Sequence, residues 1–263
     1  MSRALAGRNA LVTGSVAGLG LAMARALAAE GAAVTLNGLA PPGAGEAAAA
    51  ALAAETGSPV FFDPCDLADL DQIEAMMAAA AARSGAVDIL VSNAVIRHFQ
   101  PIESFSAADW NASIAVNLSA AFHAARLALP GMKAAGWGRI VHLSSIYGQR
   151  GAENRVDYVT TKTALIGLTR AIAIETAATG ITCNALCPGT VPSPAILDRI
   201  AGIARRDGIS EEAAARDYIR PRHPTGRFVA PESVAALLLF LCSPAGADMT
   251  GTVLPIDGGW HAG

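Results

Sequence analysis

Charged residues are scarce in this sequence, and its net charge is small. Only 16% of the 263 residues are Asp, Glu, Lys or Arg, and the formal net charge at pH 7 is -3. The absence of a basic run argues against a nucleic-acid partner. No apolar stretch reaches membrane-spanning length, and the amino end, Met1-Ser-Arg-Ala-Leu-Ala-Gly-Arg, is too short and interrupted for a signal peptide. We therefore expect a cytoplasmic protein that binds neither nucleic acid nor membrane.

Cysteine is also rare. The four cysteines, Cys65, Cys183, Cys187 and Cys242, form no Cys-x-x-Cys pair and lie in apolar, strand-like or helix-like surroundings. Buried free thiols therefore explain them better than disulfides or a metal site. We predict no metal.

Apolar residues are abundant, at 52% of the chain. Runs rich in Val, Ile and Leu alternate with amphipathic or Ala-rich helical segments, which predicts a single α/β domain of the Rossmann type spanning residues 1–263. Its doubly wound parallel sheet should have about seven strands, near 9–13, 32–37, 59–63, 87–92, 138–144, 180–187 and 252–257. The segment at about 190–226 breaks the alternation, because four prolines bracket a charged helical insert there. We interpret this insert as a substrate lid.

A glycine-rich loop follows the first expected strand. The strand Asn9-Ala-Leu-Val-Thr13 leads into Gly14-Ser-Val-Ala-Gly18-Leu-Gly20 and then into an Ala/Leu-rich helix. Gly14 would permit a tight turn, Gly18 would let the backbone approach a pyrophosphate, and Gly20 would allow close packing of helix on strand. The amino end of the helix would then face the phosphates. This context favours a dinucleotide site.

Three further residues form a proton-transfer arrangement for an alcohol. Tyr158 and Lys162 are four residues apart, so a helix places them on one face, and Ser145 precedes Tyr158 by thirteen residues. A tyrosine phenol ordinarily titrates near pH 10, roughly three units too high for a base at neutral pH, and a neighbouring cation favours the ionised form. Taken singly, a half-buried Tyr with a solvated Lys would be the simpler interpretation. Together with the glycine loop, the set indicates an oxidoreductase.

These motifs resemble the short-chain dehydrogenase/reductase family along essentially the whole chain. The resemblance rests on Thr13-Gly-x-x-x-Gly-x-Gly20, Asn93-Ala94, Asn117, Ser145, Tyr158-x-x-x-Lys162 and Pro188-Gly189, although Val95 stands where the family usually has glycine. It implies that Tyr158 removes the hydroxyl proton while a hydride passes to a nicotinamide, and that Ser145, rather than Ser144, hydrogen-bonds the substrate oxygen. Lys162 would also bind the nicotinamide ribose, and Asn117 would hold a water for proton exit.

The expected cofactor is NAD. After the second strand, Thr35-Leu-Asn37-Gly-Leu-Ala-Pro41 has no basic residue for a 2′-phosphate, and neither has the glycine loop. The resemblance implies that Asp66-Leu67 hold the adenine and that Asn93 and Pro188-Gly189 border the nicotinamide. The full set of expected cofactor residues is Gly14, Val16, Gly18, Leu19, Gly20, Asn37, Asp66, Leu67, Asn93, Tyr158, Lys162, Pro188, Gly189, Val191 and Ser193.

Substrate residues follow from a similarity, within the family, to bacterial 3-hydroxybutyrate dehydrogenases. Where those enzymes hold a carboxylate with Gln, Lys and Gln, this chain has Arg97, Arg155 and Arg199. The guanidinium group of arginine can donate two parallel hydrogen bonds to a carboxylate, sulfonate or phosphate group. We therefore expect an anionic hydroxy compound as substrate. The alternative is that these arginines are solvated or pair with Glu153, Asp157 or Asp198. The expected substrate residues are Arg97, Ser145, Tyr147, Arg155, Tyr158, Thr190, Arg199 and Trp260.

Four functions remain open at this stage. The leading one is an NAD-dependent dehydrogenase of a hydroxy acid, sugar acid or sulfonated sugar. A neutral sugar or polyol dehydrogenase is second, and a 3-ketoacyl reductase or a non-catalytic NAD(H) sensor is less favoured. Family members commonly assemble as tetramers through helices around 109–135 and 155–178, and the apolar 163–173 stretch suits such burial. We therefore expect a homotetramer.

Overall fold

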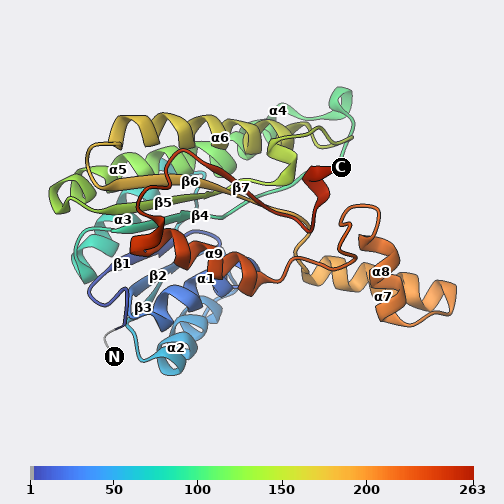
Figure 1. Cartoon of the computed structure of the whole chain (residues 1–263), viewed down its shortest axis with the longest axis horizontal. Helices are drawn as coiled ribbons and strands as arrows, with labels where there is room; N and C mark the ends of the chain where they lie inside the picture. The colour runs from blue at the N-terminus through green and yellow to red at the C-terminus, as the bar shows by residue number, and fades with distance from the viewer. Residues whose placement is uncertain (1–2) are drawn as a thin grey trace.

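Parallel hydrogen-bonded strands form the centre of the molecule (Figure 1). The computed structural model describes residues 3–263, so Met1 and Ser2 of the amino end lie outside it. Within that range seven strands pair in the order β3-β2-β1-β4-β5-β6-β7, all parallel. They are β1 (Asn9–Val12), β2 (Ala33–Asn37), β3 (Val60–Asp63), β4 (Ile89–Ser92), β5 (Gly138–Leu143), β6 (Ile181–Pro188) and β7 (Val253–Ile256). The predicted doubly wound Rossmann-type fold is confirmed.

The order of the strands reverses at β1. The chain runs outward from β1 to β2 and β3, and then crosses back so that β4 pairs with the other side of β1. Strands β1, β4, β5 and β6 are buried along their whole length, as expected for a sheet covered on both faces. Loops that leave β1 and β4 diverge to opposite faces, which opens a crevice at the carboxyl ends of the strands.

Helices cover both faces of this sheet. One core packs α1 (Gly18–Ala29), α2 (Ala44–Thr56) and α9 (Pro231–Cys242) on one face, and a second core packs α3 (Leu70–Ser84), α5 (Ala120–Ala135) and α6 (Val156–Thr176) on the other (Figure 1). Small residues dominate where α1 and α5 meet the sheet, which lets helix and strand backbones approach closely. All four cysteines are buried free thiols, in agreement with the sequence analysis.

The long helix expected around 109–135 is present, but a π-helical turn interrupts it. Helix α4 (Ala107–Ile114) continues through a π-helical turn, Ala115–Ser119, into α5. The combined stretch, Ala107–Ala135, is by length and composition long enough to cross a membrane, with a mean hydropathy of 1.3 in its most apolar window. Its alanine face, however, is buried against α3 and the sheet, which is the packing of a core helix.

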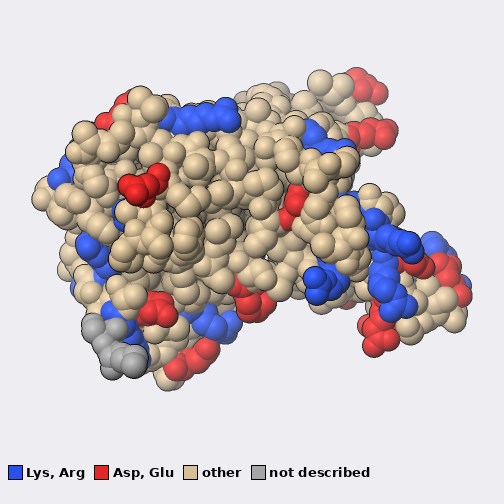
Figure 2. Space-filling model, viewed as in Figure 1, with Lys and Arg blue, Asp and Glu red and all other residues tan. Residues whose placement is uncertain are grey.

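The insert predicted at about 190–226 is a pair of helices, α7 (Pro194–Asp207) and α8 (Glu211–Ile219). They project from the body beside the carboxyl ends of the strands (Figure 1) and pack on each other through Ile200, Ala204 and Ala214. Figure 2 shows acidic and basic side chains gathered on this projection, whereas the visible face of the body is mostly uncharged. The projecting segment at about 190–226, for which 'lid' is used below as a name of its place only, therefore forms a small charged unit of its own.

Gly20 provides a test of the close packing in the glycine loop. A Cβ at this position would meet the carbonyl oxygen of Gly14, and would lie 2.7 Å from Asn93 Nδ2 and 2.8 Å from Ser15 Cα. We expect Gly20→Ala to lower the free energy of unfolding by about 1–3 kcal/mol, because the crowding atoms are mostly backbone. The matched control is Gly151→Ala, where nothing lies within 4 Å of the added Cβ. Urea denaturation of both variants measures the difference, and equal stabilities would contradict the prediction.

Candidate active site

A cleft of about 1220 Å³ lies at the carboxyl ends of the strands, between the sheet and the lid. Its walls come from the loops after β1 to β6, together with α7, α8 and the carboxyl-terminal Trp260. Every residue that the sequence analysis assigned to cofactor or substrate lines this cleft, and so do Ser145, Tyr158 and Lys162. Asn117 does not line it. The fold therefore brings together residues that are up to 246 positions apart, from Gly14 to Trp260.

The three glycines of the loop occupy different environments. Gly14 has a positive φ of 61°, and an added Cβ would lie 2.7 Å from Ala94 Cα, so the turn requires glycine. Gly18 also has a positive φ, of 59°, but nothing lies within 4 Å of its Cβ position. It begins α1 and lines the cleft, so its backbone is open to a bound group at the helix amino end. The loop thus fits a dinucleotide pyrophosphate.

Hydrogen bonds join the loop after β1 to the loop after β4. Thr13 Oγ1 accepts from the backbone N–H groups of Asn93, at 2.9 Å, and Ala94, at 3.1 Å. In return Asn93 Nδ2 donates to the carbonyl oxygens of Thr13, at 3.0 Å, and Gly14, at 2.8 Å. Asn93 therefore holds the glycine loop in place as well as lining the cleft. Val95, the departure from the family pattern, also lines the cleft.

At the β2 end the cleft is uncharged apart from one carboxylate. Gly38, Leu39 and Leu67 line it there beside Val16, together with Asp66. Asn37 lies beneath them, fully buried, and its Nδ2 donates to the carbonyl oxygens of Asp63 and Cys65. Leu39 is 74% exposed. Within residues 3–263, no Lys or Arg lines this end.

Tyr158 lies in the first turns of α6, with three basic side chains around its ring. The Cζ atoms of Arg155 and Arg97 are 4.6 and 5.3 Å from the ring centroid, and Lys162 Nζ is 5.6 Å from it. Tyr158 as a whole residue is 7% exposed. A phenolate formed here would therefore be surrounded by groups of opposite charge.

Lys162, one helical turn after Tyr158, is almost completely buried at the wall of the cleft, with 2% exposure. Its Nζ donates to the carbonyl oxygen of Leu143 at 2.6 Å. Burial, followed by repulsion from Arg97, lowers the pKa of Lys162 to about 7. From sequence, Lys162 is expected to be a plain cation, because the desolvation that opposes its charge arises only in the packed structure.

The two serines at the end of β5 differ in their contacts. Ser144 Oγ donates to the carbonyl oxygen of Lys162 at 2.7 Å, so that hydroxyl ties β5 to α6. Ser145 Oγ accepts from the backbone N–H of Tyr147 at 3.2 Å, which leaves its proton available to another acceptor. The geometry therefore suits Ser145 better than Ser144 for contact with a substrate oxygen.

Asn117 lies in the π-helical turn, a feature that often marks a functional site. It is 2% exposed, and its amide pairs with both backbone groups of Ile96: Oδ1 accepts from the N–H at 2.8 Å, and Nδ2 donates to the C=O at 3.0 Å. The side chain therefore anchors the loop after β4. Sequence alone could not show this, since the π turn is not visible in the residue pattern.

The expected substrate arginines occupy different positions in the cleft. Arg155 is half-buried, with Cζ 4.0 Å from the Phe99 ring centroid, while Arg97 and Arg199 are more exposed. Burial lowers the pKa of Arg155, and the charge of Arg97 lowers it further, against an opposite effect of Tyr158. In the part of the chain that the structure describes, none of the three arginines has an ion-pair partner, and Arg155 Nε is buried without a hydrogen bond. The suggested pairing with Glu153, Asp157 or Asp198 is not found there.

The structure adds cleft residues that the sequence analysis missed. Arg150 and Arg222 line the cleft, and each donates to a backbone carbonyl, of Trp260 and Tyr218 respectively, at 3.0 Å. The Tyr147 and Trp260 rings meet edge to face at 5.3 Å and form an aromatic wall. No spacing motif marks these arginines, because the turn after Tyr147 and the segment after α8 meet at the cleft only through the fold.

His223 holds the base of the lid and was also missed. It is fully buried, and its Nε2 accepts from the Thr190 N–H at 2.9 Å, while Nδ1 donates to the Arg227 carbonyl at 2.7 Å. These partners require the neutral ring, and burial lowers the pKa of His223 accordingly. A Cβ at Gly189 would lie 2.6 Å from this ring. The Pro188-Gly189 turn is thus fixed by a side chain from the lid.

The chain is similar to known proteins along its whole length. Residues 14–261 match the family model described as "Enoyl-(Acyl carrier protein) reductase". The chain is 43% identical over 259 residues to D-beta-hydroxybutyrate dehydrogenase of Cupriavidus necator, covering 98% of this chain and 99% of that one. It is 37% identical over 263 residues to cis-4-hydroxycyclohexanecarboxylate dehydrogenase of Sinomonas cyclohexanicum, covering both completely. L-Sorbose reductase of Gluconobacter frateurii, solved with NADPH and L-sorbose, superposes with a TM-score of 0.93 at 28% identity over both full chains.

The pKa of Lys162 leads to a testable prediction for the cofactor-free protein. A lysine in the unfolded chain titrates near pH 10.4, whereas Lys162 in the folded chain titrates at about 7. Between these values the unfolded state holds a proton that the folded state has lost, so stability rises with pH. Lys162→Met should therefore be more stable than wild type at pH 7, and this advantage should shrink toward pH 9. Urea denaturation at pH 7, 8 and 9 measures it, and a constant difference would refute the assignment.

Proposed function

The chain belongs to the short-chain dehydrogenase/reductase family, and on that premise we propose that it is an NAD-dependent dehydrogenase of a small anionic secondary alcohol. The observation that carries the proposal is the environment of Arg155. Its guanidinium is half-buried beside the Tyr158 ring, close to a second arginine, and no carboxylate among the described residues forms an ion pair with it, although the charge of Asp157 raises its pKa slightly against the larger effect of burial. A buried cation without a partner is costly, and an anionic substrate group would supply that partner.

The residues around Tyr158 suit oxidation of a carbinol. Tyr158 would take the hydroxyl proton, and Ser145 would hold the substrate oxygen through its free O–H. Lys162, one helical turn from Tyr158, would hold the cofactor ribose and adjust the charge beneath the phenol. Asn117 would act through Ile96, by keeping the wall of the cleft in place. The reverse reaction would use the same groups with the proton returned by Tyr158.

The glycine loop and the cleft fit a dinucleotide, which we propose is NAD. Gly18 leaves the amino end of α1 open, and Asn37, Gly38, Leu39, Asp66 and Leu67 surround the place for the adenosine. A 2′-phosphate there would meet Asp66 and no cation among residues 3–263, which supports NAD over NADP. When bound, the nicotinamide would supply the hydride acceptor. Pro188, Gly189, Val191 and Ser193 would border it on the lid side.

Two observations support an anionic substrate: the arginines of the cleft and the names of two relatives. Arg97 and Arg155 flank the Tyr158 ring, and Arg199 lies on the lid across the same cleft, with Tyr147, Thr190 and Trp260 as neutral walls. The names of two relatives give hydroxy acids as their substrates, D-beta-hydroxybutyrate and cis-4-hydroxycyclohexanecarboxylate. The aromatic wall of Tyr147 and Trp260 would suit a carbon skeleton larger than butyrate.

A neutral sugar or polyol is the second candidate. The likeness to L-sorbose reductase in its complex with L-sorbose covers the whole chain and favours this reading of the cleft. In that case Arg97 and Arg155 would serve the packing of Tyr158 and Phe99 rather than an anion.

Assembly and location belong to the same proposal. We expect a homotetramer in the cytoplasm. Phe122 on α5 and Ile174 on α6 are apolar and 47% and 81% exposed, and both lie on the helices through which family members commonly pair. Burial of these side chains between subunits would supply part of the association energy.

The first experiment is an NAD-reduction screen with paired anionic and neutral alcohols. The panel contains D-3-hydroxybutyrate, cis-4-hydroxycyclohexanecarboxylate, a sugar acid and a sugar sulfonate, each beside a methyl ester, polyol or sugar of similar size. We expect turnover of anions, and Arg155→Ala should reduce kcat/KM for them by about 10- to 100-fold, because a charge-assisted contact is lost. The KM for NAD should change little. Turnover confined to neutral sugars would favour the second candidate, and equal effects on both KM values would contradict the arginine role.

The cofactor preference can be tested at Leu39. This side chain lines the adenosine end of the cleft and is 74% exposed, so a longer side chain fits there without repacking. We expect Leu39→Arg to raise kcat/KM for NADP by about tenfold or more, because it adds a cation for the 2′-phosphate. Leu39→Gln, of similar length but uncharged, is the control. If wild type already prefers NADP, the proposed cofactor is wrong.

A further inference from the structure

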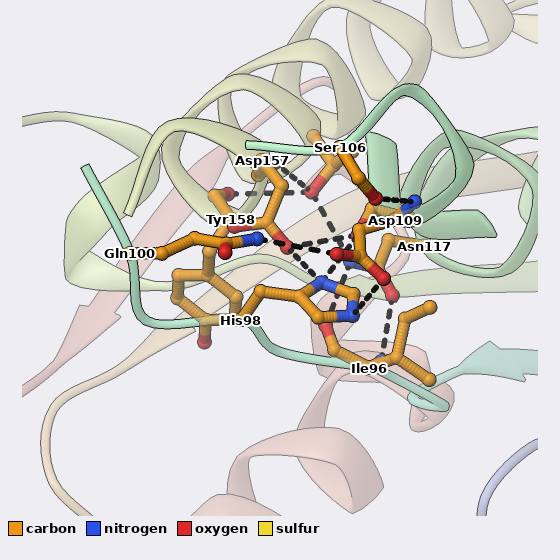
Figure 3. Close-up of polar contacts among 10 residues, drawn as sticks. Ile96, His98, Gln100, Ser106, Asp109, Asn117, Asp157 and Tyr158 are labelled. Carbon is orange, nitrogen blue, oxygen red and sulfur yellow. Dashed lines mark hydrogen bonds and ion pairs between the residues drawn. The ribbon is translucent and has the colours of Figure 1, made fainter. Parts of the chain in front are cut away.

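His98, which directly follows Arg97 in the sequence, lies between the carboxylates of Asp157 and Asp109 (Figure 3). Its Nδ1 is 3.0 Å from Asp157 Oδ2, on α6, and its Nε2 is 3.5 Å from Asp109 Oδ1, on α4. Ser113 Oγ, also on α4, donates to the same oxygen of Asp157 at 2.8 Å. The Phe105 ring meets the imidazole edge to face at 5.6 Å. A side chain from the loop after β4 is thus tied to two helices.

Of the two contacts that His98 makes with carboxylates, the one with Asp157 should hold the imidazole more strongly. The Asp157 side chain is 0% exposed, whereas that of Asp109 is 41% exposed, so water screens only the second pair. Burial would raise the pKa of Asp157, but hydrogen bonds from His98 and Ser113 outweigh it and hold the pKa below the usual range. Asp157 therefore presents a buried carboxylate for which His98 is a principal partner. It also directly precedes Tyr158 on α6.

The segment that carries His98 has a second attachment two residues earlier. Asn117 binds both backbone groups of Ile96 from the π-helical turn. Arg97 lies between the two attached residues, Ile96 and His98, and its Cζ is 5.3 Å from the Tyr158 ring centroid. Phe99 directly follows His98, and its ring centroid is 4.0 Å from Arg155 Cζ. The backbone on both sides of Arg97 is therefore held.

We propose that His98 is a positioning residue for substrate specificity: its contact with Asp157 holds the 96–99 segment so that Arg97 and Phe99 shape the anion site. The proposal rests on the proposed function, since the site it shapes is the anionic subsite. Nothing in the proton transfer at Tyr158 requires His98, whose imidazole faces α4 and α6, while the Tyr158 ring points away from it (Figure 3). Its loss should therefore affect recognition of the anion more than the chemical step.

The geometry also indicates which nitrogen of the His98 ring makes the contact that holds the 96–99 segment. In either protonation state, an Nδ1–H can donate to Asp157, whereas Nε2 reaches only the exposed Asp109. Asparagine places its Nδ2 donor near the position of Nδ1, and alanine has no donor. His98→Asn should therefore keep the essential contact, and His98→Ala should lose it. The exposed Arg25–Glu55 pair, which joins α1 and α2, provides a control, Glu55→Gln.

The first measurement is hydrogen exchange of the full chain, which needs no substrate. We expect His98→Ala to speed exchange in peptides that cover 96–99 by about tenfold, because a local attachment is removed. His98→Asn should stay close to wild type, as should Glu55→Gln, and peptides from the β1 loop should be unchanged in all three. Unchanged exchange at 96–99 in His98→Ala would overturn the proposal, and so would a loss of protection spread over the whole chain.

The second measurement is steady-state kinetics with cis-4-hydroxycyclohexanecarboxylate and its uncharged methyl ester. We expect His98→Ala to raise KM for the carboxylate about tenfold, while KM for the ester and for NAD and the kcat for both alcohols stay within about twofold. His98→Asn should restore KM. In the Arg97→Ala background, His98→Ala should add little, because both changes remove the same placed guanidinium.

The outcomes separate this inference from the proposed function. If Arg97→Ala raises KM for the carboxylate and His98→Ala does not, the positioning role is refuted while the anionic substrate stands. If the two effects multiply in the double variant, His98 acts independently of Arg97 and the proposal fails. If Arg97→Ala leaves KM unchanged, the anionic subsite itself is wrong at this position, and the inference falls with it.

Discussion

The cleft depends on the hydrogen bonds between Thr13 and Asn93, which join the carboxyl ends of β1 and β4. These strands are neighbours in the sheet, but their following loops turn toward opposite faces, so the crevice between them would otherwise be free to widen. Because Asn93 also binds the carbonyl oxygen of Gly14, the same junction sets the turn that presents the amino end of α1. Close contact of Gly14 with Ala94 and of Gly20 with Gly14 then leaves no room for other side chains.

The charges around Tyr158 are distributed unevenly. Arg97, Arg155 and Lys162 approach its ring, whereas the nearest acidic residue in sequence, Asp157, points away and binds His98 and Ser113. Asp157 is only two residues from Arg155, but no ion pair between them is found among the described residues. Arg155 caps the amino end of α6, whereas the carboxylate of Asp157, inside the helix, is engaged by His98 and Ser113. The cleft therefore remains positive beside Tyr158.

Much of this protein could be predicted from particular residues. The alternation of apolar runs led to all seven strands within about two residues, and the glycine loop, Ser145, Tyr158 and Lys162 met in one cleft as expected. Arg150 and Arg222 were not found, because they reach the cleft from the turn after Tyr147 and from the segment after α8, and no spacing rule connects those segments. His223 was missed for the same reason: it binds the backbone of Thr190 beneath the cleft. The role of Asn117 as an anchor for Ile96 was also hidden, since it depends on a π-helical turn.

The sequence by itself determined the class of fold and predicted the glycine loop, Ser145, Tyr158 and Lys162 as candidate cofactor and proton-transfer groups, because each depends on local spacing along a strand, turn or helix. Tertiary structure alone decided which groups surround them. Burial lowers the pKa of Lys162 to about 7, leaves Arg155 without an ion-pair partner among the described residues, and pairs Asp157 with His98. This burial arises only when distant segments of the chain pack together. Desolvation is a property of a packed neighbourhood rather than of a residue, and so it has no signature in the order of the amino acids.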